Sequence, residues 1–122
     1  MYRRSLHHTA AKKLIQLYHI GGESEYVHTS RLVDKGETSI GDFSKAKYWG
    51  LIAEAEVTDE RKKTSGLWKL TEKGASFVRC QVTIPRTVLV FDDRTYGFSE
   101  DHVTIEQCLS GGGFNYRELM DA

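Results

Sequence analysis

Apolar residues recur at helical spacing in the first part of the chain. Four of them fall near positions i, i+4, i+7 and i+8: Ala10, Leu14, Leu17 and Tyr18. Such positions share one face of an α-helix, and the Gly21-Gly22 pair that follows is typical of a helix end. The pattern predicts a helix over residues 9–20 with its apolar stripe facing the core.

A polar stretch leads from this helix to a second, shorter one. Tyr26 and Val27 predict a short extended piece. The hydroxyl of Thr29 or Ser30 is suited to cap a helix, which we expect to run to about residue 35, before a closing glycine. Two helices with an extended piece between them are therefore expected here.

The third predicted helix covers residues 39–49 and carries apolar residues at every third position. Three of these are expected to pack inward: Ile40, Phe43 and Ala46. Ser39 and Asp42 have the spacing of a capping box, with Asp in place of Glu or Gln. Gly50 suits the left-handed residue that ends a helix, and Leu51 can fold back over the last turn. Four residues remain for solvent or a partner: Ser44, Lys45, Lys47 and Tyr48.

Extended patterns then surround a polar, basic loop. We expect strands over residues 51–57 and 66–70, joined by a loop at 58–66 whose composition is typical of an exposed turn. Three consecutive cations lie at its tip: Arg61, Lys62 and Lys63. Thr71 is placed to cap a further helix that runs to about residue 79.

This order of elements is the layout of a winged helix, within an α+β fold. In that fold one helix most often enters the major groove of DNA. Helix 39–49 is then the reading helix, with Ser44, Lys45, Lys47 and Tyr48 in the groove. The loop is the wing, whose Arg61, Lys62 and Lys63 would neutralise phosphates without reading sequence. A solvated hairpin tip that only aids solubility is the alternative for these cations.

Two strings of residues resemble MarR- and PadR-type winged-helix regulators. They are Trp49-Gly50-Leu51-Ile52 and Leu67-Trp68-Lys69-Leu70-Thr71-Glu72-Lys73-Gly74; in those regulators a leucine-threonine-glutamate-x-glycine string follows the wing. The resemblance covers about residues 9–80 and implies the fold more specifically than the function, because winged helices also serve as protein-interaction modules. The chain is also similar to small winged-helix proteins of phages and bacterial genomes, which supplies no activity.

The last part of the chain departs from those regulators, which commonly dimerise through long terminal helices. Residues 82–98 predict a β-hairpin that turns at Asp92-Asp93-Arg94. A short helix capped by Thr104 and a last turn at residues 114–120 follow. We therefore expect a winged-helix domain at 1–85 and an extension at 86–122, with this hairpin and short helices, packed on the same domain.

The extension has two interpretations. In the first, four hairpin residues cover a flank of the core: Val88, Val90, Tyr96 and Phe98. In the second, an edge strand of the hairpin or an apolar cluster in the tail docks a second copy or another protein. That cluster consists of Phe114, Tyr116, Leu119 and Met120. The predicted partners are thus double-stranded DNA and, through the extension, a homodimer or protein partner.

Charge is distributed unevenly although the formal net charge is zero. Residues 1–85 hold fourteen Lys and Arg against ten Asp and Glu, whereas residues 86–122 hold three against seven. The basic first part permits a nucleic-acid partner, and the acidic extension could mask it. The 39% hydrophobic content and the absence of an apolar run of about 18 to 20 residues predict a cytoplasmic, single-domain protein without a membrane segment or signal peptide.

Residue types suited to catalysis are present but are not arranged for it. Five histidines are scattered without metal-ligand spacing: His7, His8, His19, His28 and His102. Cys80 and Cys108 lie outside any paired motif and are expected to stay reduced. Residues 111–113 lack the Lys-Ser/Thr ending of a phosphate loop. We therefore expect no enzyme, cofactor or metal; the favoured function is DNA-binding transcriptional regulation, and the alternative is a non-catalytic protein-interaction module on the same scaffold.

Overall fold

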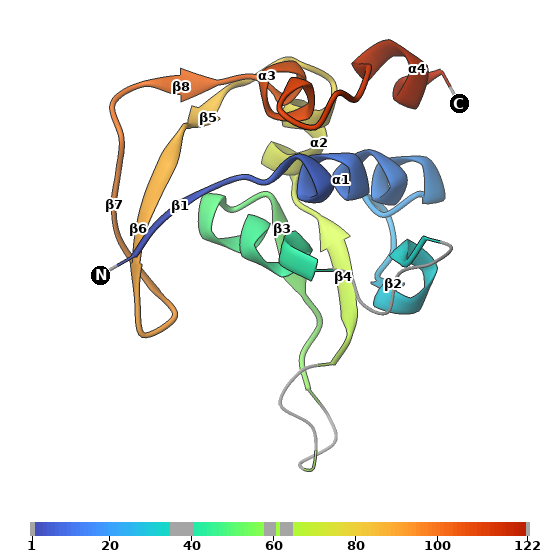
Figure 1. Ribbon diagram of the computed structural model, residues 1–122. Helices are drawn as coiled ribbons and strands as arrows, with labels where there is room; N and C mark the ends of the chain where they lie inside the picture. Colours follow the sequence, from blue (N-terminus) through green and yellow to red (C-terminus); the bar gives the residue numbers. More distant parts are fainter. Residues whose placement is uncertain (1, 35–40, 58–60, 62–64, 122) are drawn as a thin grey trace.

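The fold is mixed α+β with small antiparallel sheets (Figure 1), as the sequence predicts at this level. The computed structural model describes residues 2–34, 41–57, 61 and 65–121. In chain order the elements are β1 (Tyr2–Ser5), α1 (His8–Ile20), β2 (Val27–His28), η1 (Thr29–Leu32), η2 (Gly41–Trp49), β3 (Ile52–Glu54), β4 (Leu67–Leu70), α2 (Glu72–Val78), β5 (Ile84–Pro85), β6 (Thr87–Phe91), β7 (Arg94–Phe98), β8 (His102–Val103), α3 (Ile105–Ser110) and α4 (Tyr116–Met120).

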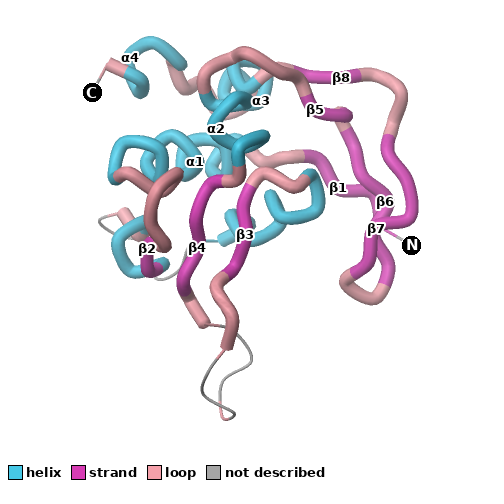
Figure 2. Tube along the Cα trace, turned by 180° about the vertical axis from the view of Figure 1, so that it is seen from behind, coloured by secondary structure: helices cyan, strands magenta, loops and turns pink. Residues whose placement is uncertain are grey.

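Helix α1 lies at the centre of the molecule. The short helices α2, α3 and α4 cover one side, and η2 with the β3–β4 hairpin covers the other (Figures 1 and 2). The predicted apolar face of α1 is buried, with Ala10, Leu14 and Leu17 at most 1% exposed. Gly21 ends the helix with a left-handed φ of 95°, which confirms the predicted helix end. No helix in the described part is long and apolar enough to cross a membrane.

The core sheet consists of β2, β4 and β3 in that order. Trp68 of β4 pairs with Val27 of β2 and Glu54 of β3. Its ring is 5% exposed and meets the ring of Phe43 edge-on at 6.2 Å between centroids. The contact between Trp68 and Phe43 therefore packs this sheet against the buried side of η2.

Helix η2 is a 3₁₀ helix over Gly41–Trp49, while residues 39 and 40 of the predicted helix lie outside the described residues. A 3₁₀ helix has three residues per turn, so apolar residues three apart share one side. Three such side chains are at most 2% exposed: Phe43, Ala46 and Trp49. The spacing seen in the sequence therefore matches this tighter helix.

The two strings that resemble winged-helix regulators contact each other directly. Gly50 ends η2 at a left-handed φ of 73°, and the Thr71 hydroxyl donates to the Gly50 carbonyl at 2.6 Å. The same hydroxyl accepts from the amide of Gly74 at 3.0 Å, which confirms the predicted cap of α2. A Cβ at Gly74 would collide with the carbonyl oxygen of Leu51. Close backbone packing thus accounts for the glycine in the second string.

The extension builds a second sheet in the order β1-β6-β7. The predicted hairpin is confirmed for β6 and β7, but β5 pairs with β8 instead of lengthening it. The pairing of β1 with β6 had no signal in the sequence. Of the four residues expected to cover the core, Val88 and Val90 are buried, whereas Tyr96 and Phe98 are 54% and 49% exposed. The expectation is therefore wrong for the two aromatic residues, because β7 lies at the sheet edge.

The short helices of the tail pack on the rest of the chain. Thr104 and Gln107 form a capping box at α3, so the predicted cap is confirmed. The Tyr116 hydroxyl of α4 donates to the Val78 carbonyl at 2.6 Å, and the apolar tail residues are partly buried against the common core. The cap of η1 was wrongly predicted, since the His28 side chain, not Thr29 or Ser30, accepts from the helix amide.

Candidate nucleic-acid interface

The structure places the residues of η2 in two groups. Ser44 and Lys45 are half-buried and Lys47 is exposed, in keeping with an outer position. Tyr48, expected on the solvent side, is only 8% exposed. The reason for this correction is the extension, which lies over the end of η2.

One carboxylate from the extension contacts both Tyr48 and Lys47. Asp93 lies in the turn between β6 and β7. The Tyr48 hydroxyl donates to its Oδ1 at 2.6 Å, and the Lys47 Nζ donates to its Oδ2 at 3.1 Å. The ammonium groups of Lys45 and Lys47 lie 5.8 and 5.5 Å from the centroid of the Tyr48 ring. Two of the predicted DNA-contact residues therefore already bind an anion of the same chain.

Electrostatics around this contact follow from its geometry. Burial raises the pKa of Tyr48 to about 12, and the hydrogen bond to Asp93 acts in the same direction. The hydrogen bonds from Tyr48 and Lys47 lower the pKa of Asp93, and Lys45 contributes. Arg4 of β1 also acts on Tyr48 through its charge, and its Nε is buried without a hydrogen-bond partner. The Asp93 carboxylate is thus held charged beside several cations.

The sequence missed Asp93 as a residue of this region. The sequence predicts it only as a turn former, which it also is, with a φ of 60°. Its contacts on η2 lie 45 and 46 residues away in sequence, beyond any local spacing pattern. The excess of acidic residues after residue 85 was the available signal, and it carries no information on which carboxylate reaches η2.

The predicted wing is described only in part. Arg61 is exposed, while Lys62 and Lys63 lie outside the described residues. The hairpin that carries this loop is present, since Ile52 pairs with Leu70 in β3 and β4. The loop connects these two strands of the core sheet, and β3 follows η2 in the sequence.

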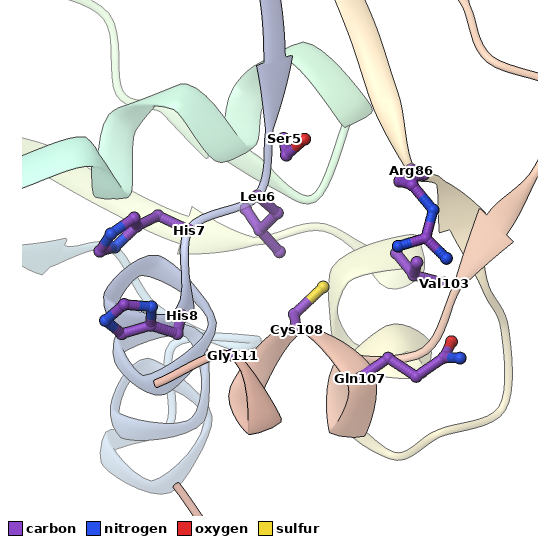
Figure 3. Close-up of a pocket in the computed structure, with 9 residues that line it drawn as sticks. All are labelled: Ser5, Leu6, His7, His8, Arg86, Val103, Gln107, Cys108 and Gly111. Atoms are coloured by element: carbon purple, nitrogen blue, oxygen red, sulfur yellow. The ribbon is translucent and has the colours of Figure 1, made fainter. Parts of the chain in front are cut away.

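A separate cavity of about 320 Å³ lies where β1 leads into α1 and meets α3. Figure 3 shows the Cys108 thiol and the Arg86 guanidinium pointing toward one another, while the rings of His7 and His8 point away. Burial raises the pKa of Cys108 to about 11, so the thiol is a poor nucleophile at neutral pH. Arg86 is paired with Asp101 at 2.6 Å, and His7 caps α1. These groups therefore have structural roles.

The part of the chain that the structure describes holds no group of three or more His, Cys, Asp or Glu side chains that could bind a metal ion. Comparisons with protein-family models, with curated proteins and with solved structures give no significant match.

Proposed function

We propose that the protein binds double-stranded DNA as a winged-helix transcriptional regulator. The observation that carries the proposal is the order and placement of its elements. Helix η2 ends at Gly50, packs on the three-stranded sheet β2-β4-β3, and is followed by a hairpin with a basic loop. In winged-helix proteins this arrangement presents a helix to the major groove and a loop to the adjacent backbone.

The residues of this surface have distinct proposed roles. Ser44 and Lys45 are half-buried on η2 and would make the groove contacts. Lys47 and Tyr48 would contact phosphate or base edges once the surface is engaged. The loop cations Arg61, Lys62 and Lys63 would neutralise phosphates and release counterions. Such contacts position the protein on the duplex, and sequence selection would come from η2.

The test is a fluorescence-anisotropy titration of a labelled random duplex at about 50 and 200 mM salt. We expect saturable binding that weakens steeply at the higher salt. The Lys45→Ala variant should bind more weakly, whereas Arg117→Ala serves as the matched control. Arg117 is an exposed cation of α4, on the side of α1 opposite η2 (Figure 1). No binding at the lower salt, or equal losses in both variants, would contradict the proposal.

A second candidate function is a protein-interaction module, and one observation favours it. Four aromatic residues of the outer sheet are about half exposed or more: Tyr2, Phe91, Tyr96 and Phe98. Phe91 and Tyr96 contact each other with ring centroids 6.3 Å apart. Exposed aromatic clusters and sheet edges are common docking surfaces. Sedimentation velocity tests its simplest form: self-association that Tyr96→Ser abolishes would support this candidate, and a monomer at all concentrations would oppose self-docking.

A further inference from the structure

A set of donors and cations converges on one carboxylate at the end of η2. Tyr48 and Lys47 each donate to a different oxygen of Asp93. Lys45 lies close enough to lower the pKa of the Asp93 carboxyl, and Arg4 close enough to influence Tyr48. Two donors aimed at two oxygens of one anion form a site for an oxyanion. We call the pair of Lys47 Nζ and Tyr48 Oη the oxyanion site.

The chemistry of this site is also that of a contact to the DNA backbone. Lysine and tyrosine are among the side chains that most often donate to phosphate oxygens. The site lies on the helix that we propose to enter the groove, and its cations belong to the basic part of the chain. A phosphate and the Asp93 carboxylate cannot both occupy it, because each needs the same two donors.

We propose that Asp93 is an internal competitor of DNA: its carboxylate fills the oxyanion site in the free protein, and a backbone phosphate takes its place in the complex. This inference rests on the proposed function, since it concerns how the same surface is regulated. It assigns the acidic hairpin turn a role beyond joining two strands. The turn sets the affinity of η2 for DNA.

The turn itself supports this role. Asp92 and Asp93 both have left-handed φ values, 51° and 60°, as a two-residue hairpin turn requires, and glycine is the usual second residue there. Aspartate tolerates this region less readily than glycine does. A residue with a carboxylate therefore occupies a position where backbone geometry alone favours glycine, and that carboxylate is the one that contacts η2.

The contact is also weak enough to be displaced. The side chains of Asp93 and Lys47 are 65% and 37% exposed, and exposed ion pairs are screened by water and salt. Strand β7 is an edge strand of its sheet, so the turn is held from one side only. A duplex offers phosphates at high charge density, which favours exchange of the carboxylate for phosphate.

The test compares Asp93→Asn with Asp92→Asn in the same anisotropy titration. Both variants remove one negative charge from the same turn, but Asp92 has no polar partner among the described residues, so Asp92→Asn controls for net charge. We expect Asp93→Asn to tighten DNA binding about three- to fivefold at low salt, and Asp92→Asn less than about twofold. Circular dichroism confirms that each variant is folded.

The possible results separate this inference from the proposed function. Equal tightening in the two variants, or weaker binding by Asp93→Asn, would overturn the competitor role while leaving DNA binding in place. Absence of binding by the wild type and both variants at low salt would overturn the proposed function, and the inference with it. Selective tightening by Asp93→Asn supports both.

Discussion

In the described part of the chain, the β3–β4 and β6–β7 hairpins both lie beside η2, and they differ in burial and in the charge of the loop that each carries. The β3–β4 hairpin belongs to the core sheet and carries a basic loop, with Trp68 and Leu70 at most 5% exposed. The β6–β7 hairpin lies in the outer sheet, ends in an acidic turn, and exposes Phe91 and Tyr96 by about half. The first hairpin is therefore packed into the core, whereas the turn and the β7 strand of the second hairpin are mostly exposed.

The difference lies in how each hairpin is tied to η2. The β3–β4 region is fixed by backbone contacts, since the Thr71 amide donates to the Leu51 carbonyl at 3.1 Å and Gly74 packs on the same group. The outer hairpin depends on side chains: the Asp93 carboxylate in its turn accepts from Tyr48 and Lys47 at the end of η2. Trp49 of η2 also donates to the Pro85 carbonyl at 2.8 Å, in β5 just before this hairpin begins. Breaking the backbone contacts would require the main chain to move, whereas the Asp93 contact can break by movement of one side chain.

The largest difference should appear when an aromatic residue of each hairpin is truncated. Trp68→Ala removes a buried ring that contacts Phe43 and should lower the free energy of unfolding by about 3–5 kcal/mol. Phe91→Ala removes a ring that is 52% exposed and should cost about 1 kcal/mol or less. Urea denaturation measures both, and comparable losses would show that the outer hairpin is as integral to the fold as the inner one.

One glycine near each hairpin, Gly74 after β4 and Gly97 in β7, can be replaced by alanine to test how closely the backbone packs there. Gly74→Ala forces a Cβ onto the Leu51 carbonyl and should destabilise by about 3 kcal/mol, because backbone cannot yield as a side chain can. Gly97→Ala places a Cβ 3.6 Å from Leu89 Cδ1, an ordinary contact, and should leave the midpoint of thermal unfolding nearly unchanged. A stable Gly74→Ala protein would contradict the close packing of the two strings.

Replacing the cations of the β3–β4 loop tests whether this basic loop, unlike the acidic turn of the β6–β7 hairpin, binds DNA phosphates. The triple variant of Arg61, Lys62 and Lys63 to alanine should weaken binding to every duplex and flatten its salt dependence by about one unit of slope per lost phosphate contact. A matched triple variant removes three exposed cations that lie outside the proposed interface: Arg3, Arg86 and Arg117. Anisotropy titrations across salt should leave the control slope close to the wild-type value. Equal slopes in both triple variants would show that the loop cations do not contact DNA phosphates.

The smallest effect is the contribution of Asp93 to stability. Its pKa is lowered in the folded state, so its stabilisation is present above the usual value of 3.8 and is lost as the pH falls through the folded pKa. Asp93→Asn should therefore reduce the free energy of unfolding by about 1 kcal/mol or less at pH 7. The two unfolding curves should converge once the pH has fallen below the lowered pKa of the folded Asp93 carboxyl. A gap that widens on acidification would show that Asp93 is not held charged.

Local signals predicted much of the fold, and distant contacts limited the rest. Gly21, Thr71 and Thr104 mark helix ends through bonds to near neighbours, so their roles can be read from spacing. The pairing of β1 with β6 joins residues more than eighty positions apart, and no local pattern encodes it. The burial of Tyr48 depends on the same extension. The candidate residues on η2 could thus be chosen by spacing, while the contact of Asp93 with η2 required the folded chain.

The most direct test of the central claim maps where DNA lies on the protein. Backbone amide spectra of the labelled protein are recorded during titration with a short duplex. If DNA binds as proposed, shifts should be concentrated in η2 and the loop at residues 58–66, together with the Asp92–Asp93 turn as Asp93 leaves the oxyanion site. Shifts confined to the outer aromatic residues Phe91 and Tyr96, or no shifts at all, would contradict this proposal.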